Sequence, residues 1–306
     1  MITSTGRQDD LIIEWHSEYI RYILDNMDKG WDFCELSENP NVTWEIVKTN
    51  PQIPWDFSYL SRNPNITWDI ITSNPDEEWD IDYLNENPNV TWEIVRDNPD
   101  YDWNYYDLSL NPNISWEIVQ ANPDLPWDYH HLSCNSSITW EIIRDNLDKN
   151  WDYEFLSANP NITWEILQAN PHIPRYYWTL SQNKNITWEI VQANPNEDWD
   201  YKFMSANPNI TWEIVQANQD KPWCYNMLSK NPNLTFEIIE ANPNRDWDYG
   251  FLSENIMTKA KKDFMIKKFT EKVALEKIER FLFHPERYLG KKIIRQWSQL
   301  PIRGTN

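Results

Sequence analysis

The residues of this 306-residue sequence best suited to chemistry are its histidines and cysteines. His130 and His131 are adjacent, so they occupy neighbouring rather than facing positions of a helix, and no single carboxylate or cysteine is marked out beside them. Cys34, Cys134 and Cys224 stand far apart, which fits neither a disulfide framework nor a metal cluster and suits a reducing compartment. No HExxH, CxxC, GxSxG or phosphate-binding P-loop sequence occurs. We therefore expect no enzyme activity, no cofactor and no metal site.

A repeat of 24 residues organises most of the chain. The tetrapeptide Thr-Trp-Glu-Ile begins at Thr43, Thr91, Thr139, Thr163, Thr187 and Thr211. A second tryptophan keeps the same interval, at Trp31, Trp55, Trp79, Trp103, Trp127, Trp151, Trp199, Trp223 and Trp247, with Arg175 as the exception. A fixed period of this length is typical of arrays in which each unit packs on its neighbours. The sequence predicts an all-α solenoid of about nine two-helix repeats with a C-terminal helical cap.

Each repeat reads as two short helices. In one copy, Thr163 is placed to cap a helix, and Ile162 just before it can pack against Leu167 at the fourth helical position. Pro171 ends that helix, and Asp152 is the expected cap of the other one. Helices of about two turns are unstable alone in water, so stacking must stabilise them. With about 9 Å between units, nine units would form a curved or superhelical rod of about 80 Å.

The two ends of the chain differ from the repeats. Residues 1–30 are predicted to be a degenerate capping half-repeat, and residues 31–255 are the solenoid. Residues 256–306 are predicted to be a basic helical tail or cap. Its apolar spacing predicts one amphipathic helix over residues 258–283 and, after His284-Pro285, a second over residues 286–300.

Some positions of the repeat are constant and others vary. Counting from the position of Trp31, the sixth is almost always Leu, the seventh Ser, and the ninth and twentieth Asn. The Trp columns are expected in the core, and the Asn amides are expected to hold turn backbone. The fourth, fifth and eighth positions vary and share a helix face; we call them the variable stripe. Its candidate partner-binding residues are Tyr106, His130, His131, Phe155, Trp178, Lys202 and Phe203.

A constant scaffold with a variable stripe is how solenoids present a binding surface, and Tyr and Trp are favoured interface residues. Neutral variation on a solvated face is the alternative. The unit at Arg175 departs most from the others, as a local defect in the stack or as a specialised contact point.

Charge is divided between the repeats and the tail. The chain carries a net charge of −21. Residues 258–306 hold 13 Lys and Arg against 5 Asp and Glu, whereas residues 1–257 hold 14 against 43. We do not expect the acidic array to bind nucleic acid, and its charge suits a basic protein partner. For the basic tail, an acidic protein is the main alternative partner, and nucleic acid a weak one.

No apolar stretch of signal-peptide or membrane-span type occurs, which predicts a cytoplasmic protein that does not bind a membrane. The Asn-x-Thr sequons, such as Asn41-Val-Thr, are expected to stay unmodified, since each Thr has a capping role.

The unit N-P-N-I-T-W-E-I-V-Q-A-N-P, joined to P-W-D-Y-x-x-L-S, resembles the tryptophan-rich 24-residue repeats of uncharacterised proteins from giant amoebal viruses and, less closely, tryptophan repeats of insect poxviruses. The resemblance covers residues 31–255, and the units that depart from it do so at Ser136, Leu147, Arg175, Lys184 and Gln219. It implies a viral origin and residence in the host-cell cytoplasm or the virion, and it carries over no activity and no catalytic residue.

The leading hypothesis is a non-enzymatic scaffold that binds a host or viral protein through the variable stripe. The alternatives are a structural virion component that packs with other particle proteins, and an adaptor whose basic tail recruits an acidic partner.

Overall fold

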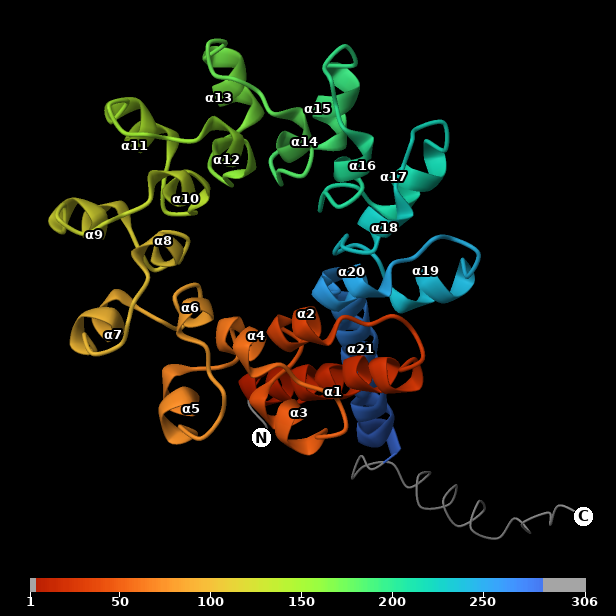
Figure 1. Ribbon diagram of the computed structural model, residues 1–306. Helices are drawn as coiled ribbons and strands as arrows, with labels where there is room; N and C mark the ends of the chain where they lie inside the picture. Colours follow the sequence, from red (N-terminus) through yellow and green to blue (C-terminus); the bar gives the residue numbers. More distant parts are fainter. Residues whose placement is uncertain (1–3, 283–306) are drawn as a thin grey trace, which may run out of the picture. The chain divides into compact units, whose positions relative to one another are not determined.

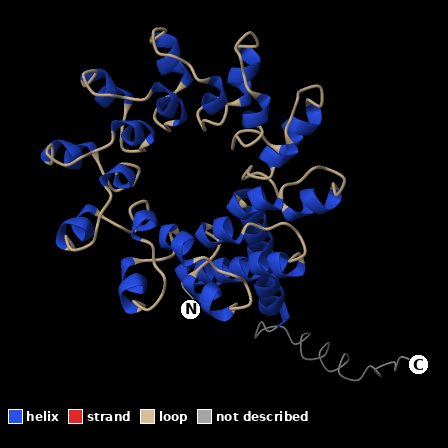
Figure 2. Cartoon of the chain, in the orientation of Figure 1, coloured by secondary structure: helices blue, strands red, loops and turns tan. Residues whose placement is uncertain are grey.

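A computed structural model describes residues 4–282 of the chain. In that range the chain forms 21 helices and no strand (Figure 2), which confirms the predicted α-solenoid. The chain divides into two compact units, one formed by His16–Ala260 and one by Met1–Trp15 with Lys261–Asn306.

The repeats of the first unit alternate between two circles of helices (Figure 1). The inner helices are α2 (Phe33–Glu38), α4 (Phe57–Arg62), α6 (Ile81–Leu84), α8 (Tyr105–Leu108), α10 (Tyr129–Cys134), α12 (Tyr153–Ala158), α14 (Tyr177–Leu180), α16 (Tyr201–Met204), α18 (Tyr225–Leu228) and α20 (Tyr249–Glu254). The outer helices are α3 (Trp44–Thr49), α5 (Trp68–Ser73), α7 (Trp92–Asp97), α9 (Trp116–Ala121), α11 (Trp140–Asp145), α13 (Trp164–Ala169), α15 (Trp188–Ala193), α17 (Trp212–Ala217) and α19 (Phe236–Ala241).

The predicted caps are confirmed. The backbone N–H of Ile166 donates to Thr163 Oγ1 at 3.4 Å at the start of α13. Asp152 Oδ1 accepts from the backbone N–H groups of Glu154 and Phe155 at the start of α12. These side chains satisfy donors that a helix leaves unpaired in its first turn. Short helices therefore start at fixed points of each repeat.

Neighbouring repeats are joined by buried polar side chains from the constant columns. Asn63 Nδ2 donates to the carbonyl oxygens of Ser37 at 2.7 Å and Asn39 at 3.1 Å, in the preceding repeat. The backbone N–H of Asp56 donates to Ser37 Oγ at 2.9 Å. Asn63 and Ser37 are fully buried, so these bonds satisfy backbone groups that water does not reach. The expected role in turn backbone is also present, because Asn63 Oδ1 accepts from the N–H of Asn65.

We call these inter-repeat hydrogen bonds of the Asn and Ser side chains the Asn ladder. The tryptophan indoles pack farther from the centre of the array than this ladder. Trp151 Nε1 donates to the carbonyl oxygen of Asn146 at 2.8 Å, and the same ring lies 5.3 Å from Tyr129 and 5.9 Å from Trp116. The small Ser and Asn columns thus join the inner helices while large aromatic rings fill the space toward the outer ones. A wedge-shaped unit rotates each repeat relative to the last, and the accumulated rotation curves the array.

This curvature closes the array into a ring, so the expected rod is wrong. Asn39 Nδ2 donates to the carbonyl oxygens of Ser253 at 2.7 Å and Asn255 at 3.0 Å. The N–H of Asp32 donates to Ser253 Oγ at 3.0 Å, and Trp31 meets Tyr249 edge-on at 5.2 Å. Helices α2 and α20 therefore pack like any two consecutive inner helices (Figure 1). With ten inner helices, each repeat turns by about 36°.

The repeat that completes the ring is assembled from both ends of the array. Its inner helix is α20, and its outer helix is the part of α1 (Ser4–Asp25) from His16 onward. Asn26 Nδ2 donates to the carbonyl oxygen of Tyr22, and Trp31 Nε1 donates to that of Asn26, as in every regular repeat. Tyr22 also stacks on Phe236 of α19 at 3.9 Å. The part of α1 from His16 onward thus takes the place of an outer helix, and the half unit that starts at Trp247 supplies the inner one.

The second unit pairs the start of α1 with α21 (Thr258–Leu282), which confirms the long helix predicted over residues 258–283. Trp15 packs edge-on against Phe264 at 5.7 Å, and Lys272 Nζ donates to Glu14 Oε1 at 2.7 Å. The helix predicted over residues 286–300 lies outside the described residues. The domain boundaries at residues 30 and 255 stay predictions.

Candidate functional site

The variable stripe lies on the inner helices, on the face opposite the core. The sixth and seventh positions of these helices, Leu and Ser, are buried in every described repeat that carries them. Helical periodicity turns the fourth, fifth and eighth positions away from that face. Among them, Tyr106, Phe155 and Trp178 are 52%, 37% and 41% exposed. The stripe is therefore accessible at these positions along the inner rim of the ring, whereas the fifth-position side chains of Thr179 and Met227 are buried.

Three predicted residues form one aromatic run on consecutive inner helices. The ring of Tyr106 on α8 lies 3.8 Å from that of His131 on α10, and His131 lies 6.1 Å from Phe155 on α12. His131 Nδ1 also lies 2.9 Å from the carbonyl oxygen of Tyr106. His131 is thus held between two repeats while the rings on each side of it stay exposed.

A second aromatic run follows on α14 and α16. Trp178 lies 5.5 Å from Phe203, and Lys202 Nζ lies 5.5 Å from the Phe203 ring. This run begins in the repeat where Arg175 replaces the usual tryptophan and continues into the repeat that starts at Trp199. The guanidinium of Arg175 lies 5.0 Å over Trp164, which keeps its regular indole neighbour, Trp199, at 5.2 Å.

The repeat that begins at Arg175 does not interrupt the stack. Asn183 Nδ2 still donates to the carbonyl oxygens of Ser157 and Asn159 in the preceding repeat, both at 3.0 Å. The turns at Ser136 and Lys184 also keep the ladder, because the Asn before each makes the regular contacts. The departures from the repeat pattern change side chains and leave the scaffold regular.

His130 does not join the aromatic runs. Its Nδ1 lies 2.9 Å from Asp152 Oδ2, and its Nε2 lies 3.2 Å from Asn150 Nδ2. His130 therefore contacts the cap of the next inner helix rather than the rings of the stripe. Of the seven predicted residues, the structure groups Tyr106, His131 and Phe155, groups Trp178, Lys202 and Phe203, and leaves His130 apart.

A second set of stripe contacts was not predicted from the sequence: charged side chains join neighbouring repeats. Arg62 of α4 donates to Glu38 at 3.2 Å and to Glu86 at 2.9 Å, in the repeats on either side. Its guanidinium lies 4.7 Å over the ring of Tyr83. The signal was present, because the eighth position reads Glu38, Arg62 and Glu86 at intervals of 24 residues.

The same bridge recurs near the other end of the array. Lys230 Nζ donates to Glu254 Oε2 at 2.7 Å and lies 4.1 Å over the ring of Phe251. In both bridges, the eighth-position cation of one repeat covers the fifth-position ring of the next and pairs with its eighth-position carboxylate. We call α2, α4, α6, α18 and α20 the bridged sector, and α8, α10, α12, α14 and α16 the open sector.

Burial raises the pKa of several carboxyl groups of the stripe. Burial raises the pKa of Glu38 to about 7 in spite of Arg62, and Glu35 beside it adds to the rise. Burial, followed by repulsion from Glu254, raises the pKa of Glu35. The pKa of Asp107, at the start of the open sector, is raised by burial and by Asp82. Desolvation is thus the main cause of each rise, and repulsion from neighbouring carboxylates is a secondary cause.

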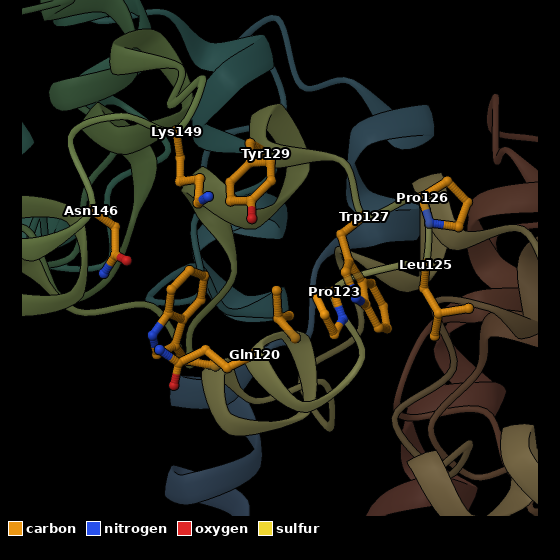
Figure 3. A pocket seen from close by; sticks show the side chains of 10 residues that line it. Gln120, Pro123, Leu125, Pro126, Trp127, Tyr129, Asn146 and Lys149 are labelled. Atoms are coloured by element: carbon orange, nitrogen blue, oxygen red, sulfur yellow. The ribbon is translucent and has the colours of Figure 1, made fainter.

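A hollow of about 380 Å³ opens between neighbouring repeats around Trp116, Trp127 and Tyr129 (Figure 3). Lys149 reaches it, but this cation already pairs with Asp148 at 3.2 Å and lies 5.9 Å from the Tyr129 ring. No nucleophile or acid–base pair lines the hollow. We assign it no function.

Over residues 4–282, no group of His, Cys, Asp or Glu is arranged to hold a metal ion. In the same part of the chain, no helix is long and apolar enough to cross a membrane. No protein-family model, no curated protein and no solved structure matches the chain. The role of the inner rim has to be inferred from its own geometry.

Proposed function

We propose that this protein is a non-enzymatic interaction scaffold, in which a ring of repeats presents the open sector of the variable stripe to a protein partner. The observation that carries the proposal is the run of exposed aromatic rings on consecutive inner helices, with Tyr106, Phe155 and Trp178 at its most accessible points. Large, rigid rings on a fixed scaffold provide contact area at a low cost in side-chain entropy, and Tyr and Trp are enriched among residues that dominate binding.

The chemistry of the thiols supports a binding role over a catalytic one. Burial raises the pKa of both Cys34 and Cys134, so neither thiol has the lowered pKa of an activated nucleophile. The proposal also takes its setting from the 24-residue unit, which resembles viral tryptophan repeats: a viral protein, acting in the host-cell cytoplasm or within the virion, whose partner is a host or viral protein.

The test is affinity capture from host-cell lysate with the full-length chain and a quadruple variant, Tyr106→Ala, Phe155→Ala, Trp178→Ala and Phe203→Ala. Captured proteins are cross-linked, and the cross-link positions are mapped. We expect a partner that cross-links to the inner helices and is lost from the quadruple variant.

A matched control carries alanine at exposed outer positions, Glu93→Ala, Glu117→Ala, Glu165→Ala and Glu189→Ala, on four outer helices. Circular dichroism and thermal unfolding establish that both variants keep the fold. Capture that is equal for the wild type and the quadruple variant, or cross-links confined to residues 258–306, would overturn the proposal and move the function to the tail.

A further inference from the structure

The bridged sector shows which chemical group packs over the aromatic side chains at the fifth position of the repeat. At Tyr83 and at Phe251, the chain places a cation over the ring, Arg62 at 4.7 Å and Lys230 at 4.1 Å. Two unrelated side chains, one guanidinium and one ammonium, occupy the same position in two separate repeats. The attraction is electrostatic, because the face of an aromatic ring is its negative region.

At Phe155 in the open sector the corresponding eighth-position cation is missing. The ring of Phe155 occupies the position of Tyr83 and Phe251, but the eighth position of the preceding repeat is Cys134 and that of its own repeat is Ala158. Phe155 is 37% exposed, and Trp178 on the next inner helix is 41% exposed. Small side chains thus leave Phe155 without the cation that covers Tyr83 and Phe251, and Trp178, at the fourth position, adds a second exposed ring.

The charge of the surroundings favours the same occupant. Residues 1–257 hold 14 Lys and Arg against 43 Asp and Glu. Glu154 lies beside Phe155 on α12, and the pKa of Asp107 on α8 is raised by burial and by nearby Asp82. A positively charged segment that approaches the open sector therefore meets attraction at long range and uncovered rings at contact.

We propose that the open sector binds an extended Lys- or Arg-bearing segment of a partner protein, whose cations lie over Phe155 and Trp178 as Arg62 and Lys230 lie over the rings of the bridged sector. This inference rests on the proposed function and names the chemistry of the partner. Neighbouring inner helices pack about 9 Å apart, and an extended segment in the polyproline II conformation rises about 3.1 Å per residue and presents every third side chain on one face. Cations at every third residue of the partner therefore match consecutive repeats.

The probe is a fluorescent peptide of about twelve residues with Arg at every third position and Gly or Ser elsewhere. Its affinity for the full-length chain is measured by fluorescence anisotropy at about 0.15 M salt. A peptide with citrulline in place of each Arg keeps the shape and removes the charge. The protein variant is Phe155→Leu with Trp178→Leu, which keeps apolar bulk and removes the rings. The control variant is Phe251→Leu, whose ring Lys230 already covers.

We expect the arginine peptide to bind and the citrulline peptide to bind at least about tenfold more weakly. The double variant should lose about tenfold in affinity for the arginine peptide, and Phe251→Leu should stay within about twofold of the wild type. Equal affinity of the wild type and the double variant would overturn the inference, because binding would then be general attraction to an acidic protein. Equal binding of the two peptides would overturn it as well.

The outcome separates this inference from the proposed function. If Phe155→Leu with Trp178→Leu abolishes capture of a cellular partner while the arginine peptide does not bind, the stripe binds a partner of other chemistry. The inference then falls and the proposed function stands. If neither capture nor peptide binding depends on the open sector, both fall.

Discussion

The bridged and open sectors use one scaffold in two ways. In both, the Asn ladder joins consecutive inner helices, as Asn63 does in the bridged sector and Asn159 in the open sector. They differ in the variable stripe. The bridged sector covers its rings with its own cations and pairs them with its own carboxylates, whereas the open sector leaves rings exposed beside small side chains. The stripe is used for internal stabilisation in one region and stays free in the other.

The charge bridges lie on either side of the interface that closes the array. Arg62 reaches both neighbours of α4, and Lys230 joins α18 to α20, so the two bridges flank the contact between α20 and α2. That contact joins Asn39 to Ser253, 214 residues apart, whereas interior contacts join residues about 26 apart. For a flexible chain, this difference in separation costs roughly 2 kcal/mol more in closure entropy. The two charge bridges thus lie next to the interface whose two sides are farthest apart along the chain.

The first prediction, with the largest expected loss of stability, removes an asparagine of the Asn ladder in each sector. Asn39→Ala removes the side-chain donor to the carbonyl oxygens of Ser253 and Asn255, and Asn159→Ala removes the donor to those of Ser133, Asn135 and Ile138; each change should lower the free energy of unfolding by about 2–3 kcal/mol. Asn39→Ala should also open the ring locally, because its interface has no short covalent tether. Hydrogen exchange should rise in α2 and α20 for Asn39→Ala and stay confined to α10 and α12 for Asn159→Ala.

A closed ring in Asn39→Ala, with exchange no faster in α20 than in the wild type, would show that the closing interface is as well tethered as the others. Small-angle scattering gives an independent measure, since an opened array has a larger radius of gyration.

The second prediction moves a bridge into the open sector. Cys134→Arg with Ala158→Glu gives Phe155 the neighbours that Phe251 has in Lys230 and Glu254. The added pair should raise stability by up to about 1 kcal/mol, since such pairs are partly exposed. It should also weaken binding of the arginine peptide by about tenfold, because the new side chain covers the ring that the peptide would use. Unfolding midpoints and anisotropy titrations measure the two effects.

The single changes Cys134→Arg and Ala158→Glu are the matched controls. The first covers the ring without a carboxylate partner, and the second adds a carboxylate without covering the ring. Full peptide affinity in the double variant would mean that Phe155 does not contact the peptide.

The sequence allowed the repeat, its caps and its constant columns to be predicted, because these are local. Thr163 caps α13 through a residue three positions away, and the spacing of 24 residues repeats the pattern. The variable stripe was also predictable, since positions three and four apart share a helix face. The contact of one member, His130, with Asp152 was not predictable from a single repeat, because it depends on the adjacent one.

Ring closure could not be predicted from any single repeat. The partners of Asn39 are carbonyl groups that look the same in every unit, and which unit supplies them depends on a small rotation summed over the whole array. A hint was present in the half units at both ends, since the one around Asn26 lacks an inner helix and the one from Trp247 lacks an outer helix. The charge bridges, in contrast, could have been predicted by comparing the residue at the eighth position in successive repeats.

The third prediction removes the cation at the centre of a bridge. Arg62→Met leaves Glu38 and Glu86 without their shared partner, and Arg62 is the group that lowers both of their pKa values. The free energy of unfolding should fall by about 1–2 kcal/mol at pH 8, where the carboxylates are charged, and by less at pH 5. Denaturant unfolding at the two pH values measures this. Arg62→Lys keeps the positive charge but cannot donate to both carboxylates in the same geometry, so it should lower the free energy of unfolding by less than Arg62→Met does.

The smallest effect isolates the charge of Glu38. Its pKa of about 7 lies above the ordinary value of 4.5, so the folded state binds more protons than the unfolded state between these values. The resulting stabilisation is complete below about pH 4.5 and is lost as pH rises through about 7. Because 25% of the side chain is exposed, we expect about 1 kcal/mol between pH 5 and pH 8.

Glu38→Gln should remove that part of the pH dependence, with Glu35, Arg62 and Glu86 still facing the position. Glu45→Gln, on the outer helix α3 where the side chain is 73% exposed, should leave it unchanged. An identical pH slope in Glu38→Gln and the wild type would mean that the pKa of Glu38 is not raised in the folded state. The distinction between the two sectors would then rest on the covered rings alone.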